Sequence, residues 1–202
     1  MLYEAQFRNP AGAGKLIQAI RDMDLPELRI MEICGTHTMS IAKAGLRQIL
    51  PPHIHLISGP GCPVCVTPSG VMDEVLRISQ LPNVTITTYG DLLRVPGSVP
   101  GDNLQRRSAQ GADVRMVYSP MDSLDMAEQE PDREFIFLGV GSETSAPGTA
   151  IAVQEAKARG RKNFSLLSLL KRTEPAMRAI IESDGFNVSG FLCPGHVATI
   201  LG

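Results

Sequence analysis

Tryptophan is absent from the 202-residue sequence, and aromatic residues make up only 4% of it. The core must therefore be built mainly from aliphatic side chains, with the nine methionines as adaptable core filler. A hydrophobic fraction of 43% and a charged fraction of 20% are typical of globular domains. The length suits one large domain or two small ones, and a core of that size needs no disulfides.

An excess of charge of either sign is also lacking. The 19 basic and 21 acidic residues give a net charge of -2, with no basic block, which argues against a dedicated nucleic-acid or anionic-membrane binder. Apolar runs such as Phe135–Val140 are too short to span a bilayer, and the first ten residues lack a signal-peptide pattern. We therefore expect no nucleic-acid or membrane partner, and a cytoplasmic location in which thiols stay reduced.

Cysteine is sparse as well. The chain has four, Cys34, Cys62, Cys65 and Cys193, and only Cys62 and Cys65 are close in sequence. A structural zinc site usually takes its ligands from two close pairs. The cysteine pattern therefore favours a redox pair or a thiolate metal site over structural zinc.

Short apolar runs alternate with amphipathic ones along the whole chain. Strands are expected at Leu28–Ile33, His53–Ile57, Val84–Thr88, Val114–Tyr118, Glu134–Val140, Phe164–Leu167 and Gly190–Leu192. Helices are expected at Ala13–Met23, Thr38–Ile49, Gly70–Gln80, Asn103–Gly111, Ser123–Glu128, Pro147–Arg159 and Glu174–Ser183. This alternation predicts an α/β fold with right-handed crossovers and mainly parallel sheets.

The polar, acidic stretch Met121–Arg133 contains Pro131 and is the best candidate for a boundary between domains. We therefore expect two small Rossmann-like parallel-sheet units, at residues 1–125 and 126–202. The sequence ends at Gly202, a few residues into an expected helix. The second unit is accordingly expected to be incomplete and the chain to be a truncated form.

Four unusual segments directly follow expected strands. They are Cys34–Thr38, Gly59–Pro68, Gly141–Pro147 and Cys193–Val197. Because the carboxyl ends of parallel strands lie on one edge of a sheet, where α/β proteins bind ligands, these segments can converge. Each also precedes an expected helix, whose N-terminal amides favour negative charge.

The first segment places Cys34 at a strand end, just before a helix. That position favours the thiolate, which is the form that binds metal. His37 lies three residues further on and becomes a neighbour if the intervening residues turn. The alternative is a buried, inert cysteine followed by a capping threonine.

The second segment contains the pair Cys62 and Cys65 within Gly-Pro-Gly-Cys-Pro-Val-Cys. The two-residue spacing brings the sulfur atoms within reach of a disulfide or of a shared metal ion, and the prolines stiffen the loop. A redox or metal role is favoured over a purely structural loop, because packing alone rarely requires so many glycines, prolines and thiols together.

The other two segments are more ambiguous. Glu143 can orient a histidine or accept a proton, but it can equally interact with a helix dipole. His196 is a candidate site residue or a solvated residue at a helix start. Cys193 ends an apolar strand and is more simply read as a core thiol.

Together these segments resemble the signature motifs of the HypD family of hydrogenase maturation proteins. The matching residues are Cys34–Thr38, Gly59–Pro68 and Pro194–Val197, with Gly141–Pro147 as a fourth, and their order agrees along the whole chain. The resemblance implies two similar α/β domains that face a cleft. It implies a scaffold that holds iron while the Fe(CN)2CO group of a [NiFe]-hydrogenase is assembled.

The resemblance also implies roles for individual residues. Cys34 corresponds to the thiol that holds iron, and Cys62 and Cys65 correspond to a redox-active pair. The expected catalytic residues at the cleft are His37, Glu143 and His196. Residues expected to contact the bound group are Thr36, Thr38, Gly59, Gly61, Thr144, Pro194 and Gly195.

The partners implied by the resemblance are a HypC-type chaperone, which shares the iron through a cysteine, and a HypE-type protein that supplies cyanide. The family also carries a [4Fe–4S] cluster, but its cysteine ligands lie beyond the end of this sequence. This sequence also has Ser142 and Ser145 where the family usually has Phe and Thr.

Two other functions remain open at this point. A thiol–disulfide oxidoreductase would use Cys62 and Cys65 and leave Cys34 structural, although Pro68 interrupts the helix start that thioredoxin-like enzymes place close to the pair. An inactive binding remnant would bind partners without iron. The iron content after anaerobic purification separates the scaffold from the oxidoreductase.

Overall fold

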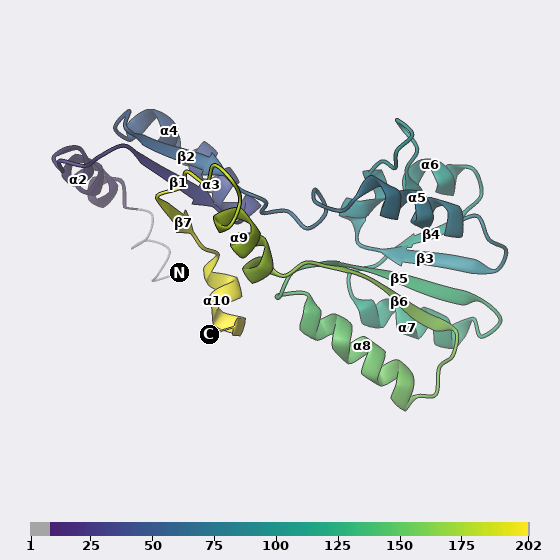
Figure 1. Cartoon of the computed structure of the whole chain (residues 1–202). Coiled ribbons are helices and arrows are strands. Elements are labelled where there is room, and N and C mark those ends of the chain that lie inside the picture. Colours follow the sequence, from purple (N-terminus) through teal and green to yellow (C-terminus); the bar gives the residue numbers. More distant parts are fainter. Residues whose placement is uncertain (1–8, 202) are drawn as a thin grey trace. The chain divides into compact units, whose positions relative to one another are not determined.

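The computed structural model describes residues 9–201, which form two compact units (Figure 1). The first unit comprises the described residues up to Gly61 together with Arg178–Gly195, and the second comprises Cys62–Met177 with the described residues from His196 onward. The fold is α/β with parallel sheets, as the sequence predicts. The division differs from the boundary that we expected near residue 125, because that position lies inside the second unit.

The first unit contains a three-stranded parallel sheet in the order β2-β1-β7. The strands are β1 (Leu28–Glu32), β2 (Ile54–Ser58) and β7 (Gly190–Leu192). Glu32 at the end of β1 lies opposite both Ser58 and Leu192, so the three strands end at one edge. We had expected β7 in the second domain, but its hydrogen bonds to β1 place it in the first.

The helices of the first unit are α2 (Pro10–Arg21), α3 (Gly35–Ala44) and α4 (Leu46–Ile49), and α9 (Thr173–Ile181) and α10 (Gly195–Leu201) begin in one unit and end in the other. The single helix that we expected at 38–49 is interrupted at Gly45. This glycine has a left-handed backbone with φ 62° and donates to the carbonyls of Ala42 and Ile41. The sequence pattern does not reveal this break, because glycine is tolerated within helices as well as at helix ends.

The second unit contains a four-stranded parallel sheet in the order β4-β3-β5-β6. The strands are β3 (Val84–Thr88), β4 (Asp113–Met116), β5 (Glu134–Gly141) and β6 (Phe164–Leu170). From β3 the chain first goes outward to β4 and then returns to β5 on the other side of β3. This reversal makes the unit doubly wound, and the loops after β3 and β5 border the position where such sheets bind ligands.

Helices cover both faces of the second sheet, with α5 and α6 on one face and α7 and α8 on the other (Figure 1). They are α5 (Ser69–Ile78), the 3-10 helix η1 (Gly90–Arg94), α6 (Leu104–Ala109), α7 (Pro120–Gln129) and α8 (Ala146–Ala158). Fully buried Met72 and Val75 of α5 pack with Ile86 and Leu138 of the sheet. None of the helices within residues 9–201 is both long and apolar enough to cross a membrane.

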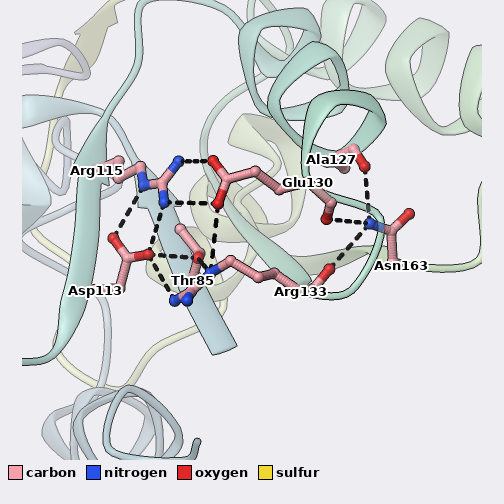
Figure 2. A network of polar contacts seen from close by, with 7 residues as sticks. All are labelled: Thr85, Asp113, Arg115, Ala127, Glu130, Arg133 and Asn163. Atoms are coloured by element: carbon pink, nitrogen blue, oxygen red, sulfur yellow. Dashed lines mark hydrogen bonds and ion pairs between the residues drawn. The ribbon is translucent and has the colours of Figure 1, made fainter. Parts of the chain in front are cut away.

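A network of charged side chains joins β3, β4 and the loop before β5 (Figure 2). Asp113 accepts hydrogen bonds from Arg115 at 3.0 and 2.8 Å, from Arg133 at 2.7 Å and from the buried hydroxyl of Thr85 at 2.8 Å. Arg115 also donates to Glu130 at 2.5 Å. Because each carboxylate meets a guanidinium group with good geometry, the partly buried charges are compensated.

Asn163 extends this network to the segment that the sequence suggested as a boundary. Its side-chain amide donates to the backbone carbonyls of Ala127, Glu130 and Arg133, at 2.8, 3.3 and 2.9 Å (Figure 2). The polar composition of this segment reflects a capped helix end and a tightly bonded loop. It does not mark a linker.

We expect Asp113→Asn to lower the free energy of unfolding by about 1–2 kcal/mol at pH 7, because two arginines lose their shared carboxylate. Burial by itself raises the pKa of Asp113. Hydrogen bonds from Arg115 and Thr85 and the charges of the two arginines outweigh this effect, so the pKa lies below its usual value. A lowered folded pKa stabilises at neutral pH, and this contribution disappears as the pH falls through the folded value.

Urea titrations of wild type and variant between pH 7 and pH 3 test this prediction. The difference between them should shrink as the pH falls below about 4, where Asp113 begins to be protonated in the unfolded chain. Asp132→Asn is the matched control, because Asp132 is exposed and lies in the same loop. Equal stability of the Asp113 and Asp132 variants at pH 7 would contradict the role given to the network.

Candidate functional site

Cys34 follows β1 and is the N-terminal cap residue of α3. Its backbone is extended, and its carbonyl accepts hydrogen bonds from the N–H groups of His37 and Thr38 at 2.8 and 3.4 Å. The sulfur lies 3.0 Å from the hydroxyl oxygen of Thr36. The half-buried thiol therefore sits at the positive end of a helix dipole and contacts a group that can donate to a thiolate.

His37 lies in the first turn of α3, and its side chain is half-buried. Its Nδ1 atom is buried and has no hydrogen-bond partner within residues 9–201. Buried polar atoms in folded proteins nearly always have a partner. This nitrogen is therefore the strongest candidate in the first segment for contact with a bound ligand.

Gly59 and Gly61 hold the loop after β2 against the end of β1. A β-carbon at position 59 would lie 2.7 Å from the carbonyl oxygen of Glu32, and one at position 61 would lie 2.6 Å from that of Ile33. The same atom at 61 would be 2.7 Å from the Cα atom of Cys34. Both positions therefore require glycine because the two backbones touch.

The pair Cys62 and Cys65 begins the second unit. The backbone N–H of Cys65 donates to the sulfur of Cys62 at 3.3 Å. Val64, between the two, packs against the core of the second unit, and the hydroxyl of Thr67 donates to the carbonyl of Pro63 at 2.9 Å. The loop is thus fixed by its own apolar and polar contacts, and both sulfur atoms are free thiols.

The two thiols are not equivalent. Cys65 is exposed, whereas Cys62 is half-buried. The pKa of Cys65 is raised above its usual value because its side chain hydrogen-bonds to that of Cys62, and burial and the charge of Cys62 add to this effect. These contacts therefore favour the protonated form of Cys65.

Glu143 follows β5 and is 8% exposed. One carboxylate oxygen accepts a hydrogen bond from the backbone N–H of Thr173 at 2.5 Å, and the other accepts one from the Thr173 hydroxyl at 2.9 Å. Burial raises the pKa of Glu143, but these hydrogen bonds and the charge of Arg172 lower it below its usual value. Both oxygens therefore hold the first turn of α9, and a catalytic role for Glu143 stays a prediction.

The turn that carries Glu143 depends on Gly141, whose φ of 149° suits glycine and whose missing side chain leaves room for Ser145. The Thr144 hydroxyl lies 3.4 Å from that of Ser142. Ser142 and Ser145, the two departures from the usual motif, thus take part in local packing of this turn.

The fourth segment follows β7. Pro194 is buried, whereas Cys193, Gly195 and His196 are exposed, and α10 begins at Gly195. The carbonyl of Leu192 accepts a hydrogen bond from the N–H of Ile33 at 3.1 Å, which extends the pairing of β7 with β1 to the residue before Cys34.

Three of the four segments therefore share the carboxyl edge of the first sheet. Cys34 follows β1, Gly59 follows β2 and Cys193 follows β7. In the second unit, Gly141–Pro147 lies at the carboxyl end of β5, and the CxxC loop leads into α5. In the described part of the chain, no three His, Cys, Asp or Glu side chains are grouped so that they could hold a metal ion. A single cleft lined by all the segments stays a prediction.

The sequence itself decides the family. The chain matches the family described as "HypD: Hydrogenase formation hypA family" over residues 12–202. It belongs to the HypD family.

Curated relatives agree with this assignment. The chain is 43% identical to "Hydrogenase maturation factor HypD" of Escherichia coli (strain K12) over 210 aligned positions. It is 42% identical to HypD2 of Bradyrhizobium diazoefficiens over 211 positions and 42% identical to HypD of Rhodobacter capsulatus over 209. Each alignment covers 100% of this chain but only 55–56% of the relative. The chain thus spans about half the length of the curated relatives that it matches.

One residue of this HypD-family chain was missed by the sequence analysis. Glu32, only 2% exposed, lies two residues before Cys34 in the central strand of the first sheet. One carboxylate oxygen accepts a hydrogen bond from Ser58 at 2.6 Å and lies 3.5 Å from Arg47. The other oxygen is buried without a partner within residues 9–201. An acidic residue inside an apolar parallel strand is the signal that could have identified it.

We expect Glu143→Gln to lower the free energy of unfolding by about 1–2 kcal/mol at pH 7, because hydrogen bonds to a charged acceptor are replaced by weaker ones. The lowered pKa of Glu143 means that this stabilisation is present at neutral pH. It should begin to shrink as the pH falls below about 4, where the carboxylate is protonated in the unfolded chain, and be lost as the pH falls through the lower folded pKa.

Chemical denaturation measured at pH 7 and at pH 3 checks this prediction. Glu155→Gln serves as the control, because Glu155 makes an exposed ion pair with Arg159 at 3.2 Å and should change stability by less than about 0.5 kcal/mol. If both variants lose the same stability at pH 7, the contact with Thr173 does not stabilise α9 as described.

Proposed function

We propose that this chain acts in [NiFe]-hydrogenase maturation, as a scaffold whose Cys34 thiolate holds iron while CO and cyanide are attached to it. The observation that carries the proposal is the position of Cys34, at the end of a central strand, capping α3 and touching the Thr36 hydroxyl. The names of the relatives, which are hydrogenase maturation factors, support the same role.

The chemistry of iron with these ligands suits the first segment. Iron that carries CO and cyanide needs soft, strongly donating ligands, and a thiolate is such a ligand. Bound cyanide is anionic and is stabilised by hydrogen-bond donors in a partly dry site. Thr36, His37 and the N-terminal amides of α3 are such donors, and the unpartnered Nδ1 of His37 supports its part in this role.

The pair Cys62 and Cys65 is proposed to supply electrons. Closure of two thiols to a disulfide releases two electrons and two protons, which is the stoichiometry of a two-electron reduction. The hydrogen bond from the Cys65 N–H to the Cys62 sulfur holds the two residues close together, which supports closure of the disulfide. One route for reducing the pair again would be the [4Fe–4S] cluster that the family carries outside the part that this chain matches.

The partners belong to the same proposal. A HypC-type chaperone would bring a second cysteine to the iron, and a HypE-type protein would deliver cyanide to it. Pro194 and Gly195 follow β7 at the sheet edge that also carries Cys34, which supports their part in the same site. A part for His196, the next residue in the chain, stays a prediction. Glu143 is kept as a residue that positions α9.

A thiol–disulfide oxidoreductase is the second candidate function. The observation in its favour is the asymmetric pair, with an exposed Cys65 and a Cys62 sulfur that accepts a backbone hydrogen bond. It assigns no role to Cys34 or to the unpartnered nitrogen of His37. For this reason we prefer the scaffold.

Cys34→Ser should reduce the iron retained after anaerobic purification with a HypC-type partner by at least about tenfold, since a hydroxyl is a much poorer ligand than a thiolate for this iron. Its stability should change by less than about 1 kcal/mol, because the residue is only half-buried and the volume change is small. Iron content and the infrared bands of CO and cyanide are measured on the same samples.

Cys193→Ser is the control, because Cys193 is also a free thiol at the carboxyl edge of the first sheet and is exposed. It should retain iron and the infrared bands. Equal iron in the two variants and wild type would remove Cys34 as the ligand. Partner binding with no iron in any sample would favour an inactive binding module.

The redox role of Cys62 and Cys65 predicts a reversible disulfide. Under mild oxidation in a dithiothreitol redox series, wild type and Cys193→Ser should each lose two titratable thiols, and Cys65→Ala should lose none. The two-residue spacing and the proline in the loop make closure inexpensive in chain entropy. If wild type keeps all its thiols across the series, the pair is structural or binds metal, and the scaffold rests on Cys34 alone.

A further inference from the structure

A pocket of about 410 Å³ in the second unit opens beside the CxxC loop. Its lining consists of Val64, Cys65, Thr67, Ser69, Asp91, Arg94, Val95 and Pro96. The volume lies within the range of small-molecule sites. The role proposed above for the thiol pair does not use this pocket.

The lining combines three kinds of group. Val64, Val95 and Pro96 supply apolar surface, Cys65 supplies an exposed sulfur, and Asp91 and Arg94 supply opposite charges. Asp91 and Arg94 are three residues apart in η1, the 3-10 helix that follows β3. The pocket is therefore built at the carboxyl edge of the second sheet, where doubly wound units bind ligands.

Both charges are available to a ligand. Within residues 9–201, Asp91 forms no ion pair, and the hydrogen bond of Arg94 there runs from Nε to Gln105 at 3.2 Å. The terminal nitrogens of the Arg94 guanidinium can thus bind a carboxylate, while Asp91 can bind an ammonium group. A carboxylate and an ammonium on one small molecule define an amino acid zwitterion.

We propose that this pocket binds a small zwitterionic thiol, of the chemical class of cysteine and glutathione, which reduces the Cys62–Cys65 disulfide. The inference rests on the redox role proposed for the pair and adds a substrate class to it. Arg94 binds the carboxylate, Asp91 binds the ammonium group, and the apolar wall contacts the carbon chain that leads to the sulfur.

The reaction is a thiol–disulfide exchange in two steps. The thiolate of the bound molecule attacks the Cys65 sulfur, which breaks the disulfide, forms a mixed disulfide on Cys65 and releases Cys62 as a thiolate. A second thiolate attacks the sulfur of the bound molecule, forms a small-molecule disulfide and releases Cys65. Two small thiols lose two electrons, and the cysteine pair gains two electrons and two protons.

The contacts of the pair decide which sulfur is attacked. Cys65 is exposed and lines the pocket, so an incoming thiolate reaches it first. The Cys65 N–H donates to the Cys62 sulfur at 3.3 Å, which stabilises Cys62 as the leaving thiolate. Both features direct attack to Cys65, because exchange is faster at an accessible sulfur with a stabilised leaving group.

The test measures how fast four thiols reduce the oxidised 202-residue chain. Cysteine carries both charges, 3-mercaptopropionate only the carboxylate, cysteamine only the ammonium group and 2-mercaptoethanol neither. Each thiol is compared with itself across wild type, Arg94→Gln and Asp91→Asn, so differences in intrinsic reactivity cancel. Arg106→Gln and Asp132→Asn are controls with the same charge changes at exposed positions outside the pocket.

Arg94→Gln should slow cysteine and 3-mercaptopropionate by roughly two- to fivefold, the effect of one solvent-exposed ion pair, and leave the other two thiols unchanged. Asp91→Asn should slow cysteine and cysteamine to a similar extent. The two controls should change no rate. Variants that affect all four thiols equally, or none, would overturn the zwitterion site while leaving the redox pair intact.

Two further outcomes separate the parts of the proposal. If no disulfide forms in wild type, the proposed redox function fails, and the thiol substrate fails with it. Oxidised wild type treated with cysteine and quenched rapidly should carry the trapped mixed disulfide on Cys65, as mapped by mass spectrometry. A mixed disulfide found mainly on Cys62 would overturn attack at Cys65.

Discussion

Backbone packing at the carboxyl end of β1 is the constraint on which the first unit's candidate site depends. The loop after β2 lies so close to this strand end that Gly59 and Gly61 leave no room for a β-carbon. Parallel pairing on both sides of β1 fixes the strand itself. Cys34 is therefore held between two neighbouring strands and the start of α3, and the next residue after Gly61 in the chain is Cys62.

The buried carboxylate of Glu32 also supports this strand end. Glu32 places a carboxylate inside the first sheet, where Ser58 and the guanidinium of Arg47 compensate one of its oxygens. A buried carboxylate costs free energy unless it is paired and hydrogen-bonded. The contacts of Glu32, two residues before Cys34, link β1, β2 and α4 at the strand end. The sequence motif begins visibly at Cys34, but its structural support begins at Glu32.

Elements of the second unit show how residues that look functional can have structural roles. Glu143 uses both oxygens to hold Thr173 at the start of α9. Val64 lies between the two cysteines and packs on the core, so it fixes the loop whose sulfurs carry the proposed chemistry. The charged residues around Asp113 lie at the opposite end of the strands and stabilise the sheet. A doubly wound sheet thus separates structural charge from reactive groups.

The local pattern of the sequence determined the strands, most helices and the residues after each strand. Val84–Thr88 and Gly190–Leu192 were predicted with the bounds found in the structure, because apolar periodicity and the flanking turn residues are local signals. The family motifs gave Cys34, Cys62 and Cys65 in the same way.

Only tertiary structure decided which strands share a sheet. β7 pairs with β1 across about 160 residues, with Ile30 opposite Gly190, and no local signal encodes this partner. The expected boundary near residue 125 failed for the same reason, since exposed polar residues mark a surface, whereas strand pairing over long distances defines a unit.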